Sequence, residues 1–383
     1  MRLAADWMNA PGSRAVMALL QAGGHGAWFV GGCVRNGLLG APVDDIDITT
    51  DARPDRVLAL AKDAGIKAVP TGIAHGTITL VVAGHPFEVT TLRRDLATDG
   101  RRATVAFTDR LQDDAARRDF TMNALYATAD GQVIDPTGHG LADLAARRLR
   151  FIGLPADRIA EDVLRILRFF RFHAWYADPD AGIDPDGLAA CAAMADGLAR
   201  LSRERIGAEM KKLLAAPDPA PAVAAMAQAG VLAQVLPGAD ARALPVLIAL
   251  EDAPPDPIRR LAVLGGDDVA DHLRLSNAER TRLSILRDGM ASTVPADALA
   301  YAHGEEIAWD IMVLRAAMFE TPPAPDTRRL IARGAAAVFP VTSADLMPSL
   351  QGAALGEALQ SLKAEWVASG FALDRAALLR RLQ

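Results

Sequence analysis

The stretch from Val30 to Thr49, VGGCVRNGLLGAPVDDIDIT, constrains the fold more than any other part of this chain. A short apolar run precedes Gly31 and Gly32, which predicts a strand, a tight turn and then a helix over 34–39. Glycines at such a turn let the backbone approach a phosphate closely. The segment Asp45–Ile48 alternates polar and apolar residues. A strand there presents both carboxylates on one face and both isoleucines to the core.

Asp45 and Asp47 repel each other when they are held on one face, and a bound divalent cation offsets that repulsion. Mg²⁺ takes oxygen ligands and is usually shared between carboxylates and substrate phosphates. The alternative is a solvated strand face, because Asp-x-Asp pairs are common. Twelve residues separate the Gly-Gly pair from Asp45, and this combination is far more specific than the tetrapeptide alone.

Strands and helices alternate through the first 92 residues. Two β-rich runs, Thr77–Val82 and Pro86–Leu92, flank a glycine-containing turn and predict a hairpin. Glu88 lies on the face opposite its apolar neighbours, which makes it a third acid for the site that contains Asp45 and Asp47. Further expected elements are a helix over 3–22 broken at Pro11-Gly12, a helix over 54–64, a mobile polar loop around Asp99-Gly100, a helix over 120–127 and a short strand at 133–134.

Beyond about residue 140 the sequence predicts helices and no strand. The expected helices cover 141–146, 157–176, 186–197, 203–215, 219–229, 241–251, 256–264, 267–273, 277–290, 294–302, 304–319, 326–337, 343–346 and 353–369. Proline-rich breaks separate several of them, and no repeat of fixed period is present. The predicted fold class is therefore α+β, with an N-terminal head that contains a small mixed or antiparallel sheet, followed by an elongated helical remainder.

The segment 116–125, ARRDFTMNAL, is a second candidate for chemistry. Arg118 is suited to bidentate contact with triphosphate oxygens. Asp119 and Asn123 stand one helical turn apart, in positions to accept and donate hydrogen bonds to sugar hydroxyls. The alternative is an ordinary helix start, with Asp119 as the cap and the arginines in solvent.

The segment 158–173, RIAEDVLRILRFFRFH, is a third candidate. On a continuous helix Asp162 and Arg165 are neighbours at i, i+3 and offer an acceptor and donors on one edge. Such a pair matches the Watson–Crick edges of cytosine and adenine and fits those of guanine and uracil poorly. The alternative is an intrahelical ion pair worth roughly 0.3–0.5 kcal/mol. Arg168 and Arg171 follow Arg165 at three-residue spacing. They either lie beside a bound nucleotide or form a solvated basic face.

The net charge of −6 over 383 residues gives no global sign of nucleic-acid binding, so any such surface is local. Residues 147–173 contain seven arginines against three acids and form such a local surface for RNA phosphates. Two distant cysteines without metal-ligand spacing indicate a reduced, cytoplasmic protein. No apolar run is long enough for a membrane span.

These motifs resemble those of the class II tRNA nucleotidyltransferases and bacterial poly(A) polymerases, which share the DNA polymerase β-type head. The similarity covers about residues 23–212 and follows the ordered motifs Gly-Gly-x-Val-Arg, Asp-Ile-Asp, Glu-Val-Thr-Thr-Leu-Arg, Arg-Arg-Asp-Phe-Thr, Asp-Pro-Thr-Gly, Glu-Asp-x-x-Arg and Ser-Arg-Glu-Arg. Two positions depart from the pattern. Asn36 stands where many relatives have aspartate, and Gly138-His139-Gly140 replaces the usual paired glycines.

The resemblance implies a role for each matching residue. Asp45 and Asp47 are expected to hold two Mg²⁺ ions, and Glu88 is the candidate third catalytic carboxylate. The remaining expected nucleotide-binding residues are Gly31, Gly32, Arg35 and Arg118 at the phosphates, Asp119 and Asn123 at the sugar, Asp162 and Arg165 at the base, and Arg168 and Arg171 nearby.

Within this family we expect untemplated addition of C, C and A to the 3′ end of tRNA from CTP and ATP, with release of pyrophosphate. The expected domains are a catalytic head (1–146), a nucleotide-selecting neck (147–215) and a tRNA-binding body and tail (216–383). No protein partner is implied. The alternatives are a poly(A) polymerase or a partial CC- or A-adding enzyme of the same fold, a catalytically retired RNA-binding module, and small-molecule adenylyl transfer.

Overall fold

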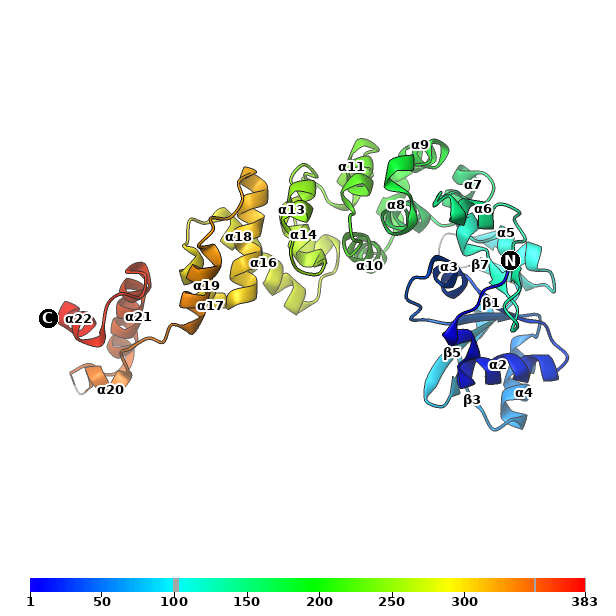
Figure 1. Ribbon diagram of the computed structural model, residues 1–383, viewed down its shortest axis with the longest axis horizontal. Helices are drawn as coiled ribbons and strands as arrows, with labels where there is room; N and C mark the ends of the chain where they lie inside the picture. Colours follow the sequence, from blue (N-terminus) through cyan, green and yellow to red (C-terminus); the bar gives the residue numbers. More distant parts are fainter. Residues whose placement is uncertain (99–102, 348, 383) are drawn as a thin grey trace. The chain divides into compact units, whose positions relative to one another are not determined.

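The computed structural model describes residues 1–98, 103–347 and 349–382 (Figure 1). The chain forms two compact units, Met1–Val235 and Leu236–Gln383. No helix in the described ranges has the length and apolar character needed to cross a membrane. The first unit contains all the strands that the structure describes and is therefore the α+β part of the chain.

The first unit is built on a mixed seven-stranded sheet with the order β3-β4-β5-β2-β1-β8-β9. Strands β2 and β5 run parallel, and every other neighbouring pair is antiparallel, including the predicted β4–β5 hairpin. A separate antiparallel hairpin, β6–β7, follows the sheet's β5. The strands are β1 (Ala27–Val30), β2 (Asp47–Thr50), β3 (Lys67–Gly72), β4 (Thr77–Val82), β5 (His85–Thr91), β6 (Arg93–Thr98), β7 (Ala103–Phe107), β8 (Tyr126–Ala127) and β9 (Val133–Ile134).

Helices α2 and α4 pack against each other and against the strands of the sheet (Figure 1). Each begins with a proline in its first turn, where the missing N–H costs no helical hydrogen bond. Alternate residues of β1, β2, β4 and β5, such as Phe29, Ile48, Ile78 and Val89, are fully buried. The head helices are α1 (Asp6–Asn9), α2 (Pro11–Ala22), α3 (Gly32–Leu39), α4 (Pro54–Asp63), α5 (Leu111–Ala116) and α6 (Gly140–Ala145), with 3₁₀ turns η1 (Ile73–His75) and η2 (Thr121–Asn123).

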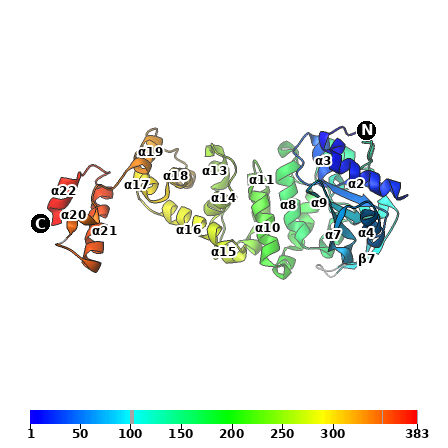
Figure 2. The same ribbon diagram turned by 90° about the horizontal axis from the view of Figure 1, so that it is seen from below.

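A helical layer completes the first unit. Helix α8 packs against both α10 and α11, and Figure 2 shows these three helices side by side. Four phenylalanines join α8 to the head. Phe120 and Phe151 form an isolated antiparallel β-bridge, and their rings contact those of Phe169 and Phe172 on the helix. The helices are α7 (Pro155–Glu161), α8 (Leu164–Tyr176), α9 (Pro185–Ala193), α10 (Arg203–Leu214), α11 (Ala220–Gln228) and α12 (Val231–Val235), with 3₁₀ turns η3 (Pro179–Ala181) and η4 (Ala195–Arg200).

The named elements of the second unit are all helices in its described residues. A buried ionic cluster lies between α14, α16 and α18, where Asp310 accepts hydrogen bonds from Arg259 and Arg282. A separate apolar cluster around Leu362 and Trp366 joins the last helices. The elements are α13 (Leu244–Leu250), α14 (Pro257–Leu264), α15 (Val269–His272), α16 (Asn277–Ala291), α17 (Ala296–His303), α18 (Glu305–Phe319), α19 (Thr327–Ala336), α20 (Ser343–Leu346), α21 (Gly352–Ala368), α22 (Arg375–Leu379) and η5 (Arg380–Leu382).

The α+β fold class is confirmed, and two local predictions are wrong. The segment 120–127 is one 3₁₀ turn and a strand rather than a helix, because β8 pairs with β1 and β9. The helix expected over 157–176 is two helices, because Asp162 takes an extended conformation with φ −150° and ψ 106°. The helices α12 and α22 and the β6–β7 hairpin were not predicted. The loop expected around Asp99-Gly100 lies outside the described residues.

Candidate active site

Gly31 forms the turn that joins β1 to α3. Its φ of 73° and ψ of −122° lie where residues with a side chain are strained. The helix begins at Gly32, so its first turn carries N–H groups that have no partner within the helix. Gly31, Gly32 and Cys33 line a cavity of about 420 Å³. A helix N-terminus open to a cavity favours an anion such as phosphate.

Two carboxylates lie on the same cavity. Asp45 precedes β2 and is exposed, and Asp47 is the first residue of that strand. Asp47 is paired in register with Glu88 on the parallel strand β5. Burial raises the pKa of Asp47, the charge of Glu88 raises it further, and the guanidinium of Arg118 partly offsets both effects. Glu88 is exposed and lies beside Asp47 rather than among the residues that line the cavity.

The donor atoms of this pair fit a hard divalent cation. Asp45 and Asp47 supply carboxylate oxygens, which Mg²⁺ prefers, and leave coordination positions for water and substrate phosphate. Within the described parts of the chain, no three His, Cys, Asp or Glu side chains form a complete cage for a metal.

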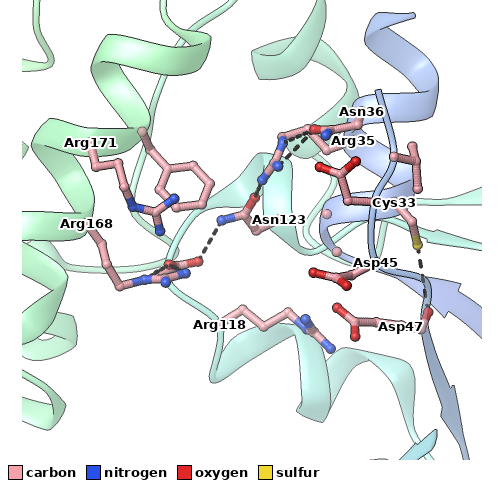
Figure 3. Close-up of a pocket in the computed structure, with 15 residues that line it drawn as sticks. Cys33, Arg35, Asn36, Asp45, Asp47, Arg118, Asn123, Arg168 and Arg171 are labelled. Carbon is pink, nitrogen blue, oxygen red and sulfur yellow. Dashed lines mark hydrogen bonds and ion pairs between the residues drawn. The ribbon is translucent and has the colours of Figure 1, made fainter. Parts of the chain in front are cut away.

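Arg118 is held from behind by two buried side chains. Asp114 Oδ2 accepts from Nη2 of Arg118 at 2.9 Å and from the hydroxyl of Tyr126 at 2.8 Å, while Asp114 Oδ1 accepts from Arg117. Burial opposes ionisation of Asp114, but Arg118 and Arg117 outweigh it and hold the pKa of this carboxyl well below its usual range. Figure 3 shows the Arg118 guanidinium pointing toward Asp47, with Asp45 beside it.

Asp119 and Asn123 form a second buried group. Asn123 Nδ2 donates to Asp119 Oδ1 at 3.0 Å, and Arg168 Nε donates to Asp119 Oδ2 at 2.7 Å. Burial disfavours the charge on Asp119, yet Arg168 and the hydrogen bonds lower the pKa of this carboxyl to about 2. The predicted spacing thus brings Asp119 and Asn123 together, although Asp119 precedes a 3₁₀ turn that ends at Asn123 and no α-helix forms.

Arg35 connects α3 to α8. It donates to Asn123 Oδ1 at 2.5 Å, to Asn36 Oδ1 and to the hydroxyl of Tyr176 at 2.8 Å. Its guanidinium lies 3.9 Å from the centre of the Tyr176 ring. Asn36 in turn donates to Pro42 O at 2.7 Å, so the residue that departs from the family pattern links Arg35 to the loop before Asp45.

The cavity brings together most of the residues expected from the sequence. Figure 3 shows Arg168 and Arg171 of the helical layer on the opposite side of the cavity from Asp45 and Asp47 of the head. The predicted residues that line it are Gly31, Gly32, Arg35, Asp45, Asp47, Arg118, Asp119, Asn123, Arg168 and Arg171. Three predicted residues, Glu88, Asp162 and Arg165, lie outside the lining.

Asp162 and Arg165 do not pair with each other as a continuous helix would require. Asp162 ends α7 and accepts from Arg205 at 2.7 Å and from the N–H of Leu164. Arg165 donates to Glu161 at 2.5 Å and to the carbonyl oxygens of Arg158 and Arg117. The continuous helix expected to carry both residues is therefore interrupted at Asp162, and in this structure the two side chains bind other protein groups.

Several residues that shape the cavity had no assigned role in the sequence. Asp114 and Tyr126 orient Arg118, Tyr176 and Phe172 stack under arginines, and Glu209 accepts from Arg171 at 2.6 Å. The aromatic pair did leave a signal. Phe172 and Tyr176 continue the row of Arg168 at four-residue spacing, which places all three on one face of α8.

Comparison with known proteins places two segments in described families. Residues 27–150 match the poly A polymerase head domain, and residues 182–242 match the probable RNA and SrmB-binding site of polymerase A. The human mitochondrial CCA tRNA nucleotidyltransferase 1 is 44% identical over 191 residues, which are 50% of this chain and 44% of the relative. The CCA-adding enzyme of Levilactobacillus brevis is 41% identical over 209 residues, 54% of this chain and 51% of the relative.

The fold is also that of a solved enzyme. The crystal structure of the Bacillus stearothermophilus CCA-adding enzyme in complex with CTP superposes with a TM-score of 0.72 at 28% identity, over 96% of each chain. The sequence matches to the two curated relatives span only about half of their length. Its head domain is therefore similar to that of poly A polymerases, and its sequence and fold are similar to those of CCA-adding enzymes.

Proposed function

We propose that this protein adds C, C and A to the 3′ end of tRNA, using CTP and ATP and releasing pyrophosphate. The observation that carries the proposal is one cavity that combines a glycine turn at a helix N-terminus, two adjacent carboxylates and four arginines. These parts match the needs of nucleotidyl transfer, which are anion binding, a metal site and charge neutralisation. The named activities of the relatives support the choice of tRNA and of these nucleotides.

Asp45 and Asp47 would hold two Mg²⁺ ions, with Glu88 beside Asp47 as the third acid. Bound Mg²⁺ supplies a lowered pKa for the attacking hydroxyl and neutralises phosphate charge. The first turn of α3 binds the triphosphate through its N–H groups, and Arg118 aligns it with fixed donors. Asp119 and Asn123 bind the sugar hydroxyls. Because these groups are already fixed in the protein, catalysis is mainly positioning and charge neutralisation.

Nucleotide choice is assigned to Asp162 and Arg165. In the structure both side chains are engaged with protein groups near the bend between α7 and α8. The edge of a cytosine or adenine base would replace those partners, and a base with the wrong donor pattern would leave them unpaired. The proposed domains follow these roles. The head (1–146) carries out catalysis, the neck (147–215) selects the nucleotide, and the body and tail (216–383) bind tRNA. Both cysteines are free and buried, which suits a reducing compartment such as the cytoplasm.

A direct test uses tRNA that lacks its CCA end and one labelled nucleotide at a time, with and without Mg²⁺. Label from CTP, and from ATP once CTP is present, supports the proposal, whereas GTP and UTP are not incorporated. The variant Asp47→Asn is expected to abolish incorporation while it keeps the unfolding profile of the wild type. Long tails of A alone would instead identify a poly(A) polymerase, which the head-domain match also accommodates. Folded protein without any incorporation would identify an RNA-binding module.

A further inference from the structure

A separate cavity in the N-terminal unit has no part in the proposed reaction. Its volume is about 490 Å³, and it shares no lining residue with the catalytic cavity. The segment 147–155, which leads from α6 to α7, forms one wall, and the stretch 181–186 at the start of α9 forms another. His173 is the residue of α8 that lines it. A cavity of this size can enclose a small organic ligand.

Burial alternates along the first wall. Leu149 and Phe151 are 3% and 2% exposed, and Phe151 forms the β-bridge with Phe120 described above. The residues between and before them, Arg148 and Arg150, are more exposed and line the cavity. The two apolar anchors therefore fix the backbone from which both cations reach the cavity.

Two of the arginines at this cavity are available for an anion. Arg147 and Arg148 are exposed, both line the cavity, and neither side chain has an ion-pair partner in the described part of the chain. Arg150 is already paired, through Nη2, with Asp143 at 3.0 Å. A guanidinium binds phosphate oxygens through two parallel hydrogen bonds, so this pair of free arginines suits one phosphate group.

His173 supplies a buried polar group. The residue is 8% exposed, and its ring has no hydrogen-bond partner among the residues that the structure describes. Burial lowers the pKa of this imidazole, so the neutral ring offers one N–H donor and one acceptor nitrogen. A buried polar group without a partner costs free energy until a ligand or water satisfies it. His173 is therefore suited to bond the polar edge of a ligand.

Apolar and acidic side chains complete the lining. Leu154 is 68% exposed and Ile183 is half-buried, so both leave apolar surface for a ligand. Asp184 caps α9 by accepting from the N–H of Gly187 at 2.8 Å, and Asp186 is exposed in the first turn of that helix. Carboxylates at nucleotide sites accept hydrogen bonds from sugar hydroxyls. The same two charges disfavour a ligand with several phosphates.

We propose that this cavity binds a nucleoside monophosphate. The phosphate lies at Arg147 and Arg148, a sugar hydroxyl donates to Asp186, and the base covers Leu154 and bonds His173 through its polar edge. A triphosphate fits the site poorly, because the lining carries two carboxylates and has no glycine turn at a helix N-terminus to bind the further phosphates. The site is distinct from the catalytic cavity and does not depend on the reaction proposed above.

Isothermal titration calorimetry of the full chain with AMP, without RNA, tests the site. One AMP should bind per chain, and omitting Mg²⁺ should change the affinity by less than about twofold, since arginines and not a metal bind the phosphate. Adenosine and inorganic phosphate each lack half of the ligand and should bind at least about tenfold more weakly. Inorganic phosphate that binds as tightly as AMP would overturn the proposal.

Variants of the lining locate the bound AMP. Arg148→Ala should weaken its binding by roughly 10- to 150-fold, the value of one charge-assisted hydrogen bond. Leu154→Glu should weaken it at least about tenfold, because a carboxylate then competes for the arginines. Leu154 is exposed, so the fold should tolerate this change. His173→Ala should weaken it by roughly 2- to 12-fold, the value of a neutral hydrogen bond. Arg56→Ala is the matched control, since Arg56 is exposed on α4 and does not line the cavity.

Arg118→Ala separates this site from the catalytic cavity, which Arg118 lines. AMP affinity should stay within about twofold of the wild-type value in this variant, because the two cavities share no residue. Unchanged AMP binding in both Arg148→Ala and Leu154→Glu overturns the proposal, and so does a loss confined to Arg118→Ala. If AMP binding depends on Arg148 while no nucleotide is incorporated into RNA, the proposal stands and the proposed function alone fails.

Discussion

Replacing Asp114 by asparagine tests whether a buried carboxylate sets the position of Arg118. The side chain of Asp114 is 1% exposed and bridges Arg117 and Arg118, whose side chains are 17% and 20% exposed. Removing one partner of a buried ion pair costs about 3–5 kcal/mol. Water reaches part of both guanidinium groups, so the loss should lie near the lower end, about 3 kcal/mol.

The neighbouring variant Asp113→Asn is the matched control. It makes the same chemical change one residue away, where the carboxylate is only half-buried and accepts from Thr108 at 2.9 Å. Asparagine can still accept this hydrogen bond through its amide oxygen, so the cost should be at most about 0.5–1.5 kcal/mol. Urea unfolding at pH 7 gives both values from the shift in midpoint.

The same substitution should lower activity through Arg118. A charge-assisted hydrogen bond is worth about 1.5–3 kcal/mol, so a displaced guanidinium lowers kcat/KM for CTP by roughly 10- to 150-fold. In an Arg118→Ala background, Asp114→Asn should add little further loss, because both changes remove one interaction. Equal stability of the Asp114 and Asp113 variants, or fully additive activity losses in the double variant, would refute the reasoning.

Three further predictions concern other parts of the chain. Gly31→Ala should lower the free energy of unfolding in urea by about 1–3 kcal/mol, since a φ of 73° strains any residue with a side chain. Gly32→Ala is the control and should cost under about 0.5 kcal/mol, because Gly32 starts a helix and only Arg35 lies within 4 Å of the new methyl group. Equal losses would contradict the turn geometry. The pKa of Asp119 is lowered to about 2, so its contribution of about 2–3 kcal/mol to the free energy of unfolding is complete above pH 4 and is lost as the pH falls from 4 to 2. The stability of Asp119→Asn should therefore depend less on pH in this window than that of the wild type. Parallel curves of stability against pH for the two proteins would exclude this contribution. Asp310→Ala, which removes the buried carboxylate that Arg259 and Arg282 share, should destabilise the second unit by about 3 kcal/mol, the lower end of the range for a buried ion pair, because each arginine keeps another carboxylate partner. Glu306→Ala, whose carboxylate also contacts Arg282 but is 80% exposed, should cost at most about 1 kcal/mol; similar losses would show that burial does not matter there.

Sequence reasoning predicted the head well because its motifs are short and act locally. The turn at Gly31 and the β4–β5 hairpin each depend on a few adjacent residues. The strand expected at Asp45–Ile48 begins only at Asp47, so Ile48 is buried as expected while Ile46 is half-buried. The register of β2 with β5, which sets Glu88 beside Asp47, is a long-range pairing and was anticipated only as a shared face. The order of the motifs carried most of the information about the family.

The errors arose where tertiary contacts override local preference. Residues 120–127 have an acceptable helical composition, but strand pairing of Tyr126 and Ala127 with β1 overrides it. The apolar periodicity of 157–176 continues through Asp162 and does not predict a break. In the structure the helix is interrupted there, and the Asp162 side chain accepts hydrogen bonds from Arg205 and from the N–H of Leu164. Asp114 gave no sequence signal distinct from its neighbour Asp113, since only packing separates a buried carboxylate from a half-exposed one.

The most direct test of the account is the intact mass of a tRNA lacking its CCA end after incubation with the protein, Mg²⁺ and all four nucleotides. The account predicts one final product that is heavier by two C and one A residues, with intermediates of one and two C. A ladder of added A residues, or incorporation of G and U at comparable rates, would contradict it.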